Sequence, residues 1–273
     1  MLMNTGRYDF RRVHTMSNEE IQKVAPSVFA DAPHDSRSER YTYIPTIEIL
    51  DRLRKEGFEP VMACQANTRD ESRRDFTKHM IRLRQSGQLT TVGAETNEVI
   101  LLNSHDGSSA YQMLAGVFRV VCSNGLVVGK MREEVRIPHK GNVVDNVIEG
   151  AFRVVQEFEM VDEQRESMKA TKLNHMERSA FAESALMLKY DPIENPAPID
   201  HTKLLTTHRH EDQSMDLWTT FNVAQENLIR GGLRGRTANR RPTTTREVKG
   251  IDQNVKLNRA LWSLAEKMRE LKG

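Results

Sequence analysis

The chain has 273 residues, of which 29% are charged and 38% hydrophobic, and its formal net charge at neutral pH is +2. This balance is typical of a folded protein with one large domain or two ordinary ones. No apolar run approaches the roughly 18 residues that a membrane-spanning helix needs, and the polar N-terminus lacks the apolar core of a secretory signal. The composition therefore predicts a cytoplasmic protein without membrane contacts.

The chain has two cysteines, Cys64 and Cys122, and each lies in an apolar, strand-like stretch of sequence. This pattern favours buried free thiols in a reducing compartment over a disulfide framework. Neither cysteine is expected to act in catalysis.

Residues 1–45 are predicted to form an N-terminal arm or cap. Within it, Ser17 and Glu20 have the spacing of a capping box, which opens a short helix. The next predicted helix is Thr46–Glu56, because its apolar residues recur at helical spacing and Gly57 can close it.

Strands are predicted to follow this helix. Phe58–Asn67 has a strand-like sequence. From Glu98 onward the pattern changes to period two and to long apolar runs, which are separated by turn sequences. Asn124-Gly125 is a strong hairpin signal, and Glu133–Pro138 adds a short strand. The pattern predicts an antiparallel meander.

Helices dominate the rest of the chain. One long helix, Asn142–Ala170, is expected to pack its apolar face on the sheet. Three more are predicted after it: Met176–Tyr190, Met215–Leu228 and Lys256–Leu271. The predicted fold class is α+β, an antiparallel β-meander packed by a long helix and followed by a helical C-terminal region. The expected domains are the arm 1–45, the α+β core 46–175, and the helical region 176–273 with a basic joint at 230–249.

Positive charge is concentrated between Arg230 and Arg259. Nine Arg and Lys residues against Glu247 and Asp252 give this segment +9 − 2 = +7, compared with +2 for the whole chain. Glycine backbone, threonine hydroxyls and guanidinium groups together suit a nucleic-acid backbone. The alternative is a solvated, mobile loop whose charge only keeps the protein in solution. The candidate contacts in this joint are Arg234, Arg236, Arg240, Arg241 and Arg246.

A second candidate surface lies in the N-terminal half of the chain. Tyr41 and Tyr43 lie between the arginines Arg37 and Arg40 and an Ile-Pro pair. Aromatic rings beside guanidinium groups are used to hold single strands. The alternative is one face of an edge strand packed on the core. The candidate contacts in this half are Arg37, Arg40, Tyr41, Arg73, Arg74, Lys78, Arg82 and Arg84.

Two polar runs contain residue types that catalysis or metal binding uses. The first, Asn103–Ser109, lacks the spacing of a nucleophile elbow or a zinc protease, and a hairpin turn explains it more simply. The second, His208–Asp212, offers potential ligands at adjacent positions, which point apart. Asp212 alternatively fits a capping or first-turn acid for the helix that carries Trp218. We predict no catalytic residue, metal or cofactor, and we expect Trp218 and Trp262 to be core anchors.

Five segments carry a recognisable sequence: Ser36–Thr46, Thr77–Arg84, Val99–Leu114, Val121–Val127 and Gly250–Trp262. They resemble the YfjQ/YafZ-type proteins of cryptic prophages and plasmids, a family described as phage/plasmid-like or as a domain of unknown function. The resemblance covers nearly the whole chain. It implies a mobile element and the cytoplasm of a bacterial host cell, and it implies no particular activity.

Mobile elements commonly encode single-strand annealing proteins of the Redβ and Erf kind. Their core resembles a helix, an antiparallel β-meander and a long packing helix beside a basic groove. The element order predicted here is similar, although the similarity is an analogy of element order only. It suggests a non-catalytic protein that binds single-stranded DNA and promotes annealing in recombination, as a homo-oligomeric ring or filament.

Two other functions stay open. One is a metal-dependent nuclease or hydrolase that uses His105 and Asp106, or the cluster His208–Asp212. The other is an interaction protein that inhibits a host defence or regulatory factor by docking the basic joint on an acidic surface. DNA and RNA, and single and double strands, also stay open as partners.

Overall fold

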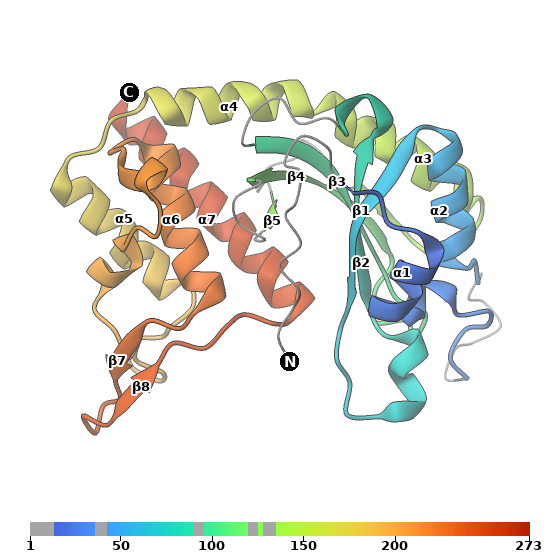
Figure 1. Cartoon of the computed structure of the whole chain (residues 1–273), viewed down its shortest axis with the longest axis horizontal. Coiled ribbons are helices and arrows are strands. Elements are labelled where there is room, and N and C mark those ends of the chain that lie inside the picture. The colour runs from blue at the N-terminus through green and yellow to red at the C-terminus, as the bar shows by residue number, and fades with distance from the viewer. Residues whose placement is uncertain (1–13, 36–42, 90–94, 120–124, 128–134) are drawn as a thin grey trace. The chain divides into compact units, whose positions relative to one another are not determined.

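The computed structural model describes residues 14–35, 43–89, 95–119, 125–127 and 135–273 (Figure 1). The chain divides into two compact units, Met1–Gly125 with Glu134–Val155 and Leu126–Glu133 with Gln156–Gly273. We describe each unit by itself. Among the described residues, no helix combines the length and the apolar character that crossing a bilayer requires.

An antiparallel sheet, together with the helices, confirms the predicted α+β class. Its strands are β1 (Phe58–Gln65), β2 (His79–Gln85), β3 (Glu95–Asn103), β4 (Tyr111–Arg119), β5 (Gly125–Val127) and β6 (Val135–Ile137). They follow the order β1-β2-β3-β4-β5, and β6 pairs with β4. The pairs β1–β2, β2–β3, β3–β4 and β4–β6 are antiparallel. The meander is therefore present, and it includes β2, a strand that the sequence analysis did not predict.

Local signals set the first two helices. The capping box that opens α1 (Asn18–Val24) is confirmed, because the amide of Ser17 donates to Glu20 Oε2 at 2.8 Å and the amide of Glu20 donates to Ser17 Oγ at 3.3 Å. Gly57, with φ +82°, follows α2 (Thr46–Lys55), as its C-terminal position predicts. Short 3₁₀ segments complete the unit: η1 (Pro26–Phe29), η2 (Glu71–Phe76) and η3 (Ser86–Gln88).

Helix α3 (Val143–Gln156) packs directly on β4 and β6. A Cβ placed on Gly150 would lie 2.6 Å from Val135 Cγ1 and 3.2 Å from Met113 Sδ, so the close approach depends on glycine. The prediction of one long helix was wrong, because Glu157 separates α3 from α4 (Phe158–Ala170). An apolar stripe runs through both helices and hides this interruption, which lies where the chain passes from one unit to the other.

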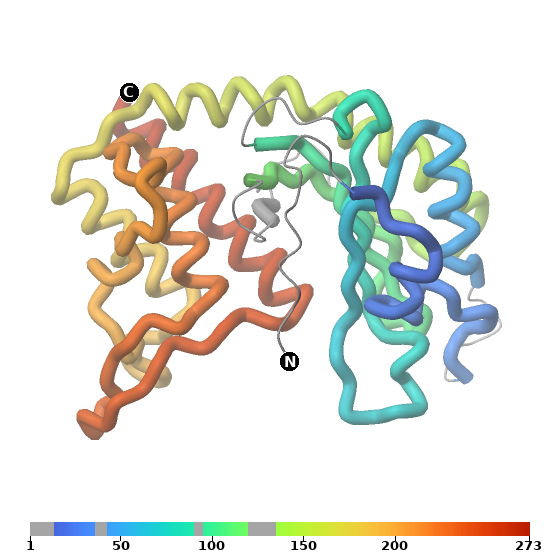
Figure 2. The backbone as a smooth tube through the Cα atoms, in the orientation of Figure 1, coloured from blue at the N-terminus to red at the C-terminus, as the bar shows by residue number. Residues whose placement is uncertain are grey.

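The second unit is helical, and α6 lies at its centre. Its elements are α4, α5 (His175–Met187), η4 (His201–Leu205), η5 (His210–Gln213), α6 (Leu217–Arg230), β7 (Arg234–Arg236), β8 (Pro242–Thr244) and α7 (Ile251–Lys272). Trp218 stacks on Phe221 with ring centroids 5.5 Å apart, and Trp262 lies edge-on to both at 5.9 Å. The two tryptophans are therefore core anchors, as predicted. Figure 2 shows the chain leaving α6, forming the β7–β8 hairpin and returning to α7.

Cys64, on β1, is a free thiol, and burial raises its pKa to about 11. A thiol with so high a pKa is largely protonated at neutral pH and therefore a poor nucleophile. Cys122 lies outside the described residues.

Candidate nucleic-acid interface

The basic joint predicted from the sequence folds into the short antiparallel hairpin β7–β8. Arg234 pairs with Thr244, and Arg236 pairs with Pro242. The connecting turn is closed by hydrogen bonds from the amide of Thr237 to the carbonyl of Arg241 at 2.9 Å and from the amide of Arg240 to the carbonyl of Thr237 at 2.8 Å. The joint is therefore an ordered element with its own backbone pairing.

Close backbone packing holds the root of this hairpin. A Cβ on Gly235 would lie 1.9 Å from the carbonyl oxygen of Pro198, and the amide of Arg236 donates to that same oxygen at 2.7 Å. At the end of α6, Gly231 has φ +68°, and a Cβ there would lie 2.6 Å from the backbone of Arg246. Both glycines let main chains approach more closely than any side chain permits.

Two lysines tie the hairpin to the helical core. Lys189 Nζ donates to the carbonyls of Leu228 and Arg246, each at 2.6 Å, and Lys203 Nζ donates to the carbonyl of Arg234 at 2.6 Å. Hydrogen bonds from a charged donor are stronger than neutral ones. The hairpin thus has a fixed base for the side chains that it carries.

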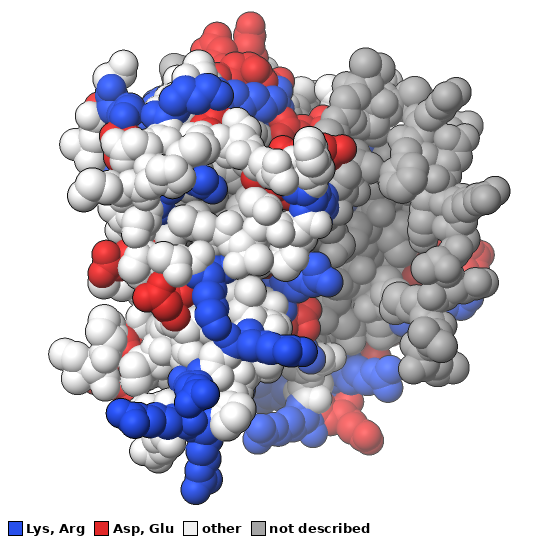
Figure 3. Space-filling view, turned by 60° about the vertical axis from the view of Figure 1, so that its left-hand side comes forward, with Lys and Arg blue, Asp and Glu red and all other residues white. Residues whose placement is uncertain are grey.

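The arginine side chains of the hairpin point to solvent. Within the described parts of the chain, none of them forms an ion pair with a carboxylate. Lys and Arg side chains gather at the lower end of Figure 3, the end at which Figure 1 draws β7 and β8. Unpaired exposed cations on a rigid element create a local positive potential that attracts polyanions. The exposed arginines are Arg234, Arg236, Arg240, Arg241 and Arg246.

Gly235→Ala tests whether the close approach to Pro198 positions the hairpin. We expect the added methyl group to displace β7 at a cost of about 1–3 kcal/mol and to accelerate amide hydrogen exchange at Arg236. The matched control is Gly250→Ala, where a new Cβ meets only Gln253 Cβ, at 3.8 Å. Equal exchange rates at Arg236 in the wild type and Gly235→Ala would contradict this role of the glycine.

Three cationic candidates of the N-terminal half lie on the first unit outside the sheet. Arg73 and Arg74 are exposed on η2, where Arg73 Nε lies 3.5 Å from Asp70 Oδ2, and Lys78 is half-buried next to β2. Arg37, Arg40 and Tyr41 lie outside the described residues.

Arg82 and Arg84 form buried ion pairs with Glu98. Their Nε atoms donate to the two carboxylate oxygens of Glu98, each at 2.6 Å. The side chains of Glu98, Arg84 and Arg82 are 0%, 5% and 12% exposed. The guanidinium of Arg82 also lies 3.3 Å from the ring centroid of Phe118. These two arginines stabilise the sheet, and we leave them out of the candidate interface.

The polar run Asn103–Ser109 covers the last residue of β3 and most of the β3–β4 connection. Asp106 Oδ1 accepts a hydrogen bond from the amide of Ser108 at 2.9 Å, and Ser104 Oγ accepts one from the amide of Ser109 at 2.8 Å. The turn interpretation of these side chains is therefore confirmed.

A buried hydrogen-bond network begins at the same end of the sheet. Thr46 Oγ1 lies 2.9 Å from His79 Nε2, 3.0 Å from His105 Nε2 and 3.0 Å from Asn103 Nδ2. His79 Nδ1 continues the network to Ser27 Oγ at 3.0 Å. Both histidines are inaccessible to solvent, so they are poorly placed to meet a substrate. The network joins α2 to β2 and β3.

This network predicts a loss of stability in acid. Burial lowers the pKa of His79 to about 4 and the pKa of His105 to about 3, from 6.5 for an exposed imidazole. Below about pH 6.5 the unfolded chain therefore binds more protons than the folded chain. The contribution of the two neutral histidines to the free energy of unfolding is complete above that pH. It is lost as the pH falls toward 4, by at most about 1.4 kcal/mol per pH unit for each histidine.

Urea unfolding at a series of pH values, with NMR titration of the histidine ring protons, measures this loss. His14→Gln is the matched control, because His14 is an exposed histidine. We expect the control to retain the acid sensitivity of the wild type. Ring protons of His79 and His105 that titrate near pH 6.5 in the folded protein would contradict the prediction.

Side chains of the second polar run, His208–Asp212, also form hydrogen bonds within the protein. Arg209 forms two hydrogen bonds with the carboxylate of Glu226, at 2.6 and 2.8 Å, and one with Asp212 Oδ2 at 3.0 Å. His208 Nε2 lies 2.8 Å from Asn227 Oδ1. Over the described residues, no group of three or more His, Cys, Asp or Glu side chains is arranged to hold a metal ion. The side chain that caps α6 is that of Asp216, which accepts from the amide of Thr219 at 2.7 Å, and not that of Asp212 as predicted.

Comparison with known proteins assigns the chain to a family. The family model described as "Domain of unknown function (DUF932)" matches residues 33–262. The chain belongs to this family. It is 53% identical to UPF0380 protein YfjQ of Escherichia coli (strain K12) over 256 residues, which cover 94% of this chain and 92% of that protein. It is 52% identical to UPF0380 protein YafZ of the same organism over 256 residues, with the same coverage. No solved structure matches the chain. The resemblance to the YfjQ/YafZ-type proteins is therefore confirmed.

Sequence reasoning missed the residues that support the hairpin. Lys189, Lys203 and Pro198 lie 31 to 57 positions from their partners along the chain, and no local pattern connects them. The sequence pattern predicts only that glycine in the joint suits contact with a nucleic-acid backbone. In the structure Gly235 lets β7 approach another part of the protein itself.

Proposed function

We propose that this protein binds the backbone of single-stranded nucleic acid, with DNA as the favoured form, through the β7–β8 hairpin. The observation that carries the proposal is the set of exposed arginines on an anchored hairpin, which have no carboxylate partner within the described residues. Arginine recognises phosphate through two parallel hydrogen bonds. Neutralising phosphates also releases condensed counterions, which supplies most of the affinity in sequence-independent binding.

Anchoring of the hairpin supports this function. A mobile basic loop loses conformational entropy when it binds, whereas a hairpin held by Gly235, Lys189 and Lys203 is ordered beforehand. Tyr190 lies beside the hairpin, and the hairpin itself carries threonine hydroxyls. An aromatic ring next to cations favours a single strand, whose unpaired bases can stack on it.

The exposed side chains of Arg73 and Arg74 are secondary candidates on the first unit. Arg82 and Arg84 are not part of the proposed contact set, because both are nearly buried and bound to the carboxylate of Glu98. Annealing by a ring or filament of identical subunits, in the cytoplasm of a bacterium that carries a mobile element, is the extended form of the proposal. The mass of the protein in solution, measured with and without an oligonucleotide, tests that form.

Filter binding of a labelled single-stranded oligonucleotide across a salt series tests the core proposal. We expect the logarithm of the affinity to fall linearly with the logarithm of the salt concentration, with a slope of roughly −0.7 for each neutralised phosphate. A flat salt response, or no binding, overturns the proposal. Tighter binding to an acidic protein surface than to the oligonucleotide would instead indicate an interaction protein, and shortening of the oligonucleotide on addition of Mg²⁺ or Mn²⁺ would indicate a nuclease.

A further inference from the structure

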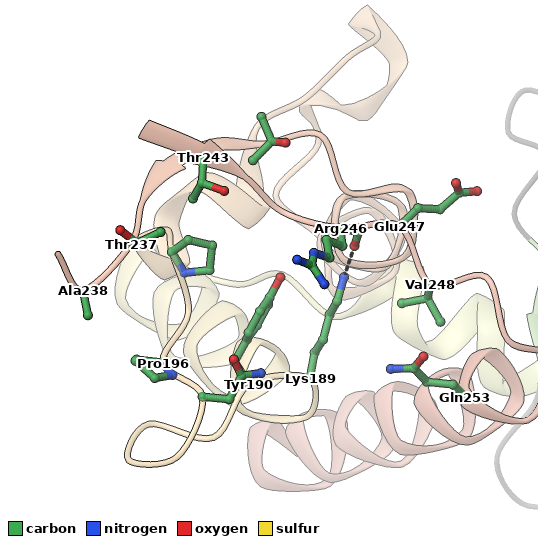
Figure 4. Close-up of a pocket in the computed structure, with 13 residues that line it drawn as sticks. Lys189, Tyr190, Pro196, Thr237, Ala238, Thr243, Arg246, Glu247, Val248 and Gln253 are labelled. Atoms are coloured by element: carbon green, nitrogen blue, oxygen red, sulfur yellow. Dashed lines mark hydrogen bonds between the residues drawn. The ribbon is translucent and has the colours of Figure 1, made fainter. Parts of the chain in front are cut away.

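A pocket of about 580 Å³ lies beside the hairpin, entirely within the second unit (Figure 4). Its walls come from the end of α5, the proline-containing loop, the hairpin and the start of α7. The residues that give it chemical character are Lys189, Tyr190, Thr237, Thr243, Thr244 and Arg246. No residue of this pocket belongs to the buried network of the first unit.

Two cationic side chains meet in the pocket. Figure 4 shows the side chains of Lys189 and Arg246 ending close to that of Tyr190. Lys189 Nζ lies 5.5 Å from the centroid of the Tyr190 ring. Lys189 is half-buried, and its ammonium group donates to two carbonyls. Because an ammonium group has three donors, one remains for a further acceptor.

Among the residues that the structure describes, no carboxylate neutralises the positive charge of the pocket. The carboxylate that lines the pocket is Glu247, which points away from Tyr190 in Figure 4 and lies 3.9 Å from Lys249 Nζ. In the described residues, no carboxylate lies within ion-pair distance of Lys189 or Arg246. Partial burial of Lys189 lowers its pKa, because removal of water disfavours the charged form. An anionic ligand would compensate this desolvation.

The other side chains favour a ligand that carries more than a phosphate. The half-buried ring of Tyr190 offers an aromatic surface for stacking. Thr237, Thr243 and Thr244 supply hydroxyl groups, which donate to phosphate oxygens and accept from sugar hydroxyls. A terminal phosphate monoester has a charge of about −1.5 to −2 at neutral pH, so it matches two cations better than the single charge of an internal diester.

We propose that this pocket binds a nucleoside monophosphate, with its phosphate on Arg246 and Lys189 and its base against Tyr190. The source of this group is either the phosphorylated end of a strand or a free nucleotide. The strand-end form rests on the proposed function, because the hairpin would hold the following phosphates of the same strand.

The experiment compares single strands of about fifteen nucleotides that carry a phosphate at the 5′ end, at the 3′ end or at neither end, each with the dye attached internally. Fluorescence anisotropy gives each affinity. We expect the wild type to prefer one phosphorylated strand by about tenfold, the effect of one charge-assisted hydrogen bond. Arg246→Gln and Tyr190→Leu should remove this preference. Because both residues also belong to the proposed single-strand surface, each is expected to weaken binding of the unphosphorylated strand as well, by about as much as the control below.

Arg240→Asn is the matched control, because Arg240 belongs to the hairpin and does not line the pocket. It should weaken binding of all three strands equally and leave the preference intact. Equal binding of the three strands by the wild type overturns the strand-end form while the proposed function of the hairpin stands.

Calorimetry with thymidine monophosphate alone tests the pocket independently of strand binding by the hairpin arginines. Binding that Arg246→Gln abolishes supports the free-nucleotide form, even if no strand binds and the proposed function fails. Absence of any thymidine monophosphate binding, together with equal affinities for the three strands, overturns the pocket proposal in both forms.

Discussion

Replacing Glu98 by glutamine is expected to lower the free energy of unfolding by about 3–5 kcal/mol. The carboxylate of Glu98 is inaccessible to solvent and accepts from two guanidinium groups, one on each oxygen. Glutamine keeps the shape but removes the charge, and its amide nitrogen would face one of the two guanidinium groups as a second donor. The change leaves two nearly buried cations, Arg82 and Arg84, without a counter-ion.

Urea unfolding followed by circular dichroism measures this effect. Glu149→Gln is the matched control, because it removes a carboxylate from an exposed ion pair. The side chains of Glu149 and its partner Arg153 are 62% and 55% exposed. Exposed pairs contribute about 1 kcal/mol or less. Joint replacement of Glu98, Arg82 and Arg84 by apolar residues of similar volume should restore most of the stability, because no charge then remains buried. Equal losses in Glu98→Gln and Glu149→Gln would show that the buried triad does not stabilise the sheet.

Neutralising the hairpin is expected to have the largest effect on binding. The variant combines Arg234→Gln, Arg236→Gln, Arg240→Asn and Arg241→Gln. The slope of the logarithm of its affinity against the logarithm of the salt concentration should become shallower by about 3, which is four contacts at roughly 0.7 each. Affinity at low salt should fall on the order of a hundredfold or more. Asparagine is chosen for Arg240 because that residue has φ 59°, a conformation that asparagine adopts more readily than arginine.

The control variant removes four cations elsewhere, three of them exposed and one, Lys169, half-buried: Lys23→Gln, Arg153→Gln, Lys169→Gln and Lys267→Gln. It has the same net charge as the hairpin variant. Unchanged circular dichroism and thermal midpoint should show that both variants are folded. If the two variants bind equally weakly, overall charge and not the hairpin governs the affinity, and the proposed interface is wrong.

Signals contained within a few residues were sufficient to predict several elements. The capping pair Ser17 and Glu20 gave the start of α1, and Gly57 marked the end of α2. The continuous apolar run Val99–Leu102 marked β3. Each of these signals depends on neighbours along the chain, and each is present in the structure.

Features that depend on distant partners were missed. Strand β2 carries Arg82 and Arg84 at alternate positions, and these charges look like an exposed surface until Glu98 of the neighbouring strand is known. The basic joint looked like a loop for a similar reason. Its order depends on Pro198 and on two lysines of the surrounding helical unit. The identity of a counter-ion or a backbone partner is a property of the fold and not of the local sequence.

The contact between Gly235 and the carbonyl of Pro198 has an evolutionary consequence. Among homologous chains that keep this contact, position 235 admits glycine alone, since even alanine would bring a carbon to 1.9 Å from an oxygen. Arg234 and Arg236, whose side chains face solvent, are under no such packing constraint. Relatives that insert or delete residues in the loop around Pro198 should therefore also change the hairpin, so that the two segments diverge together.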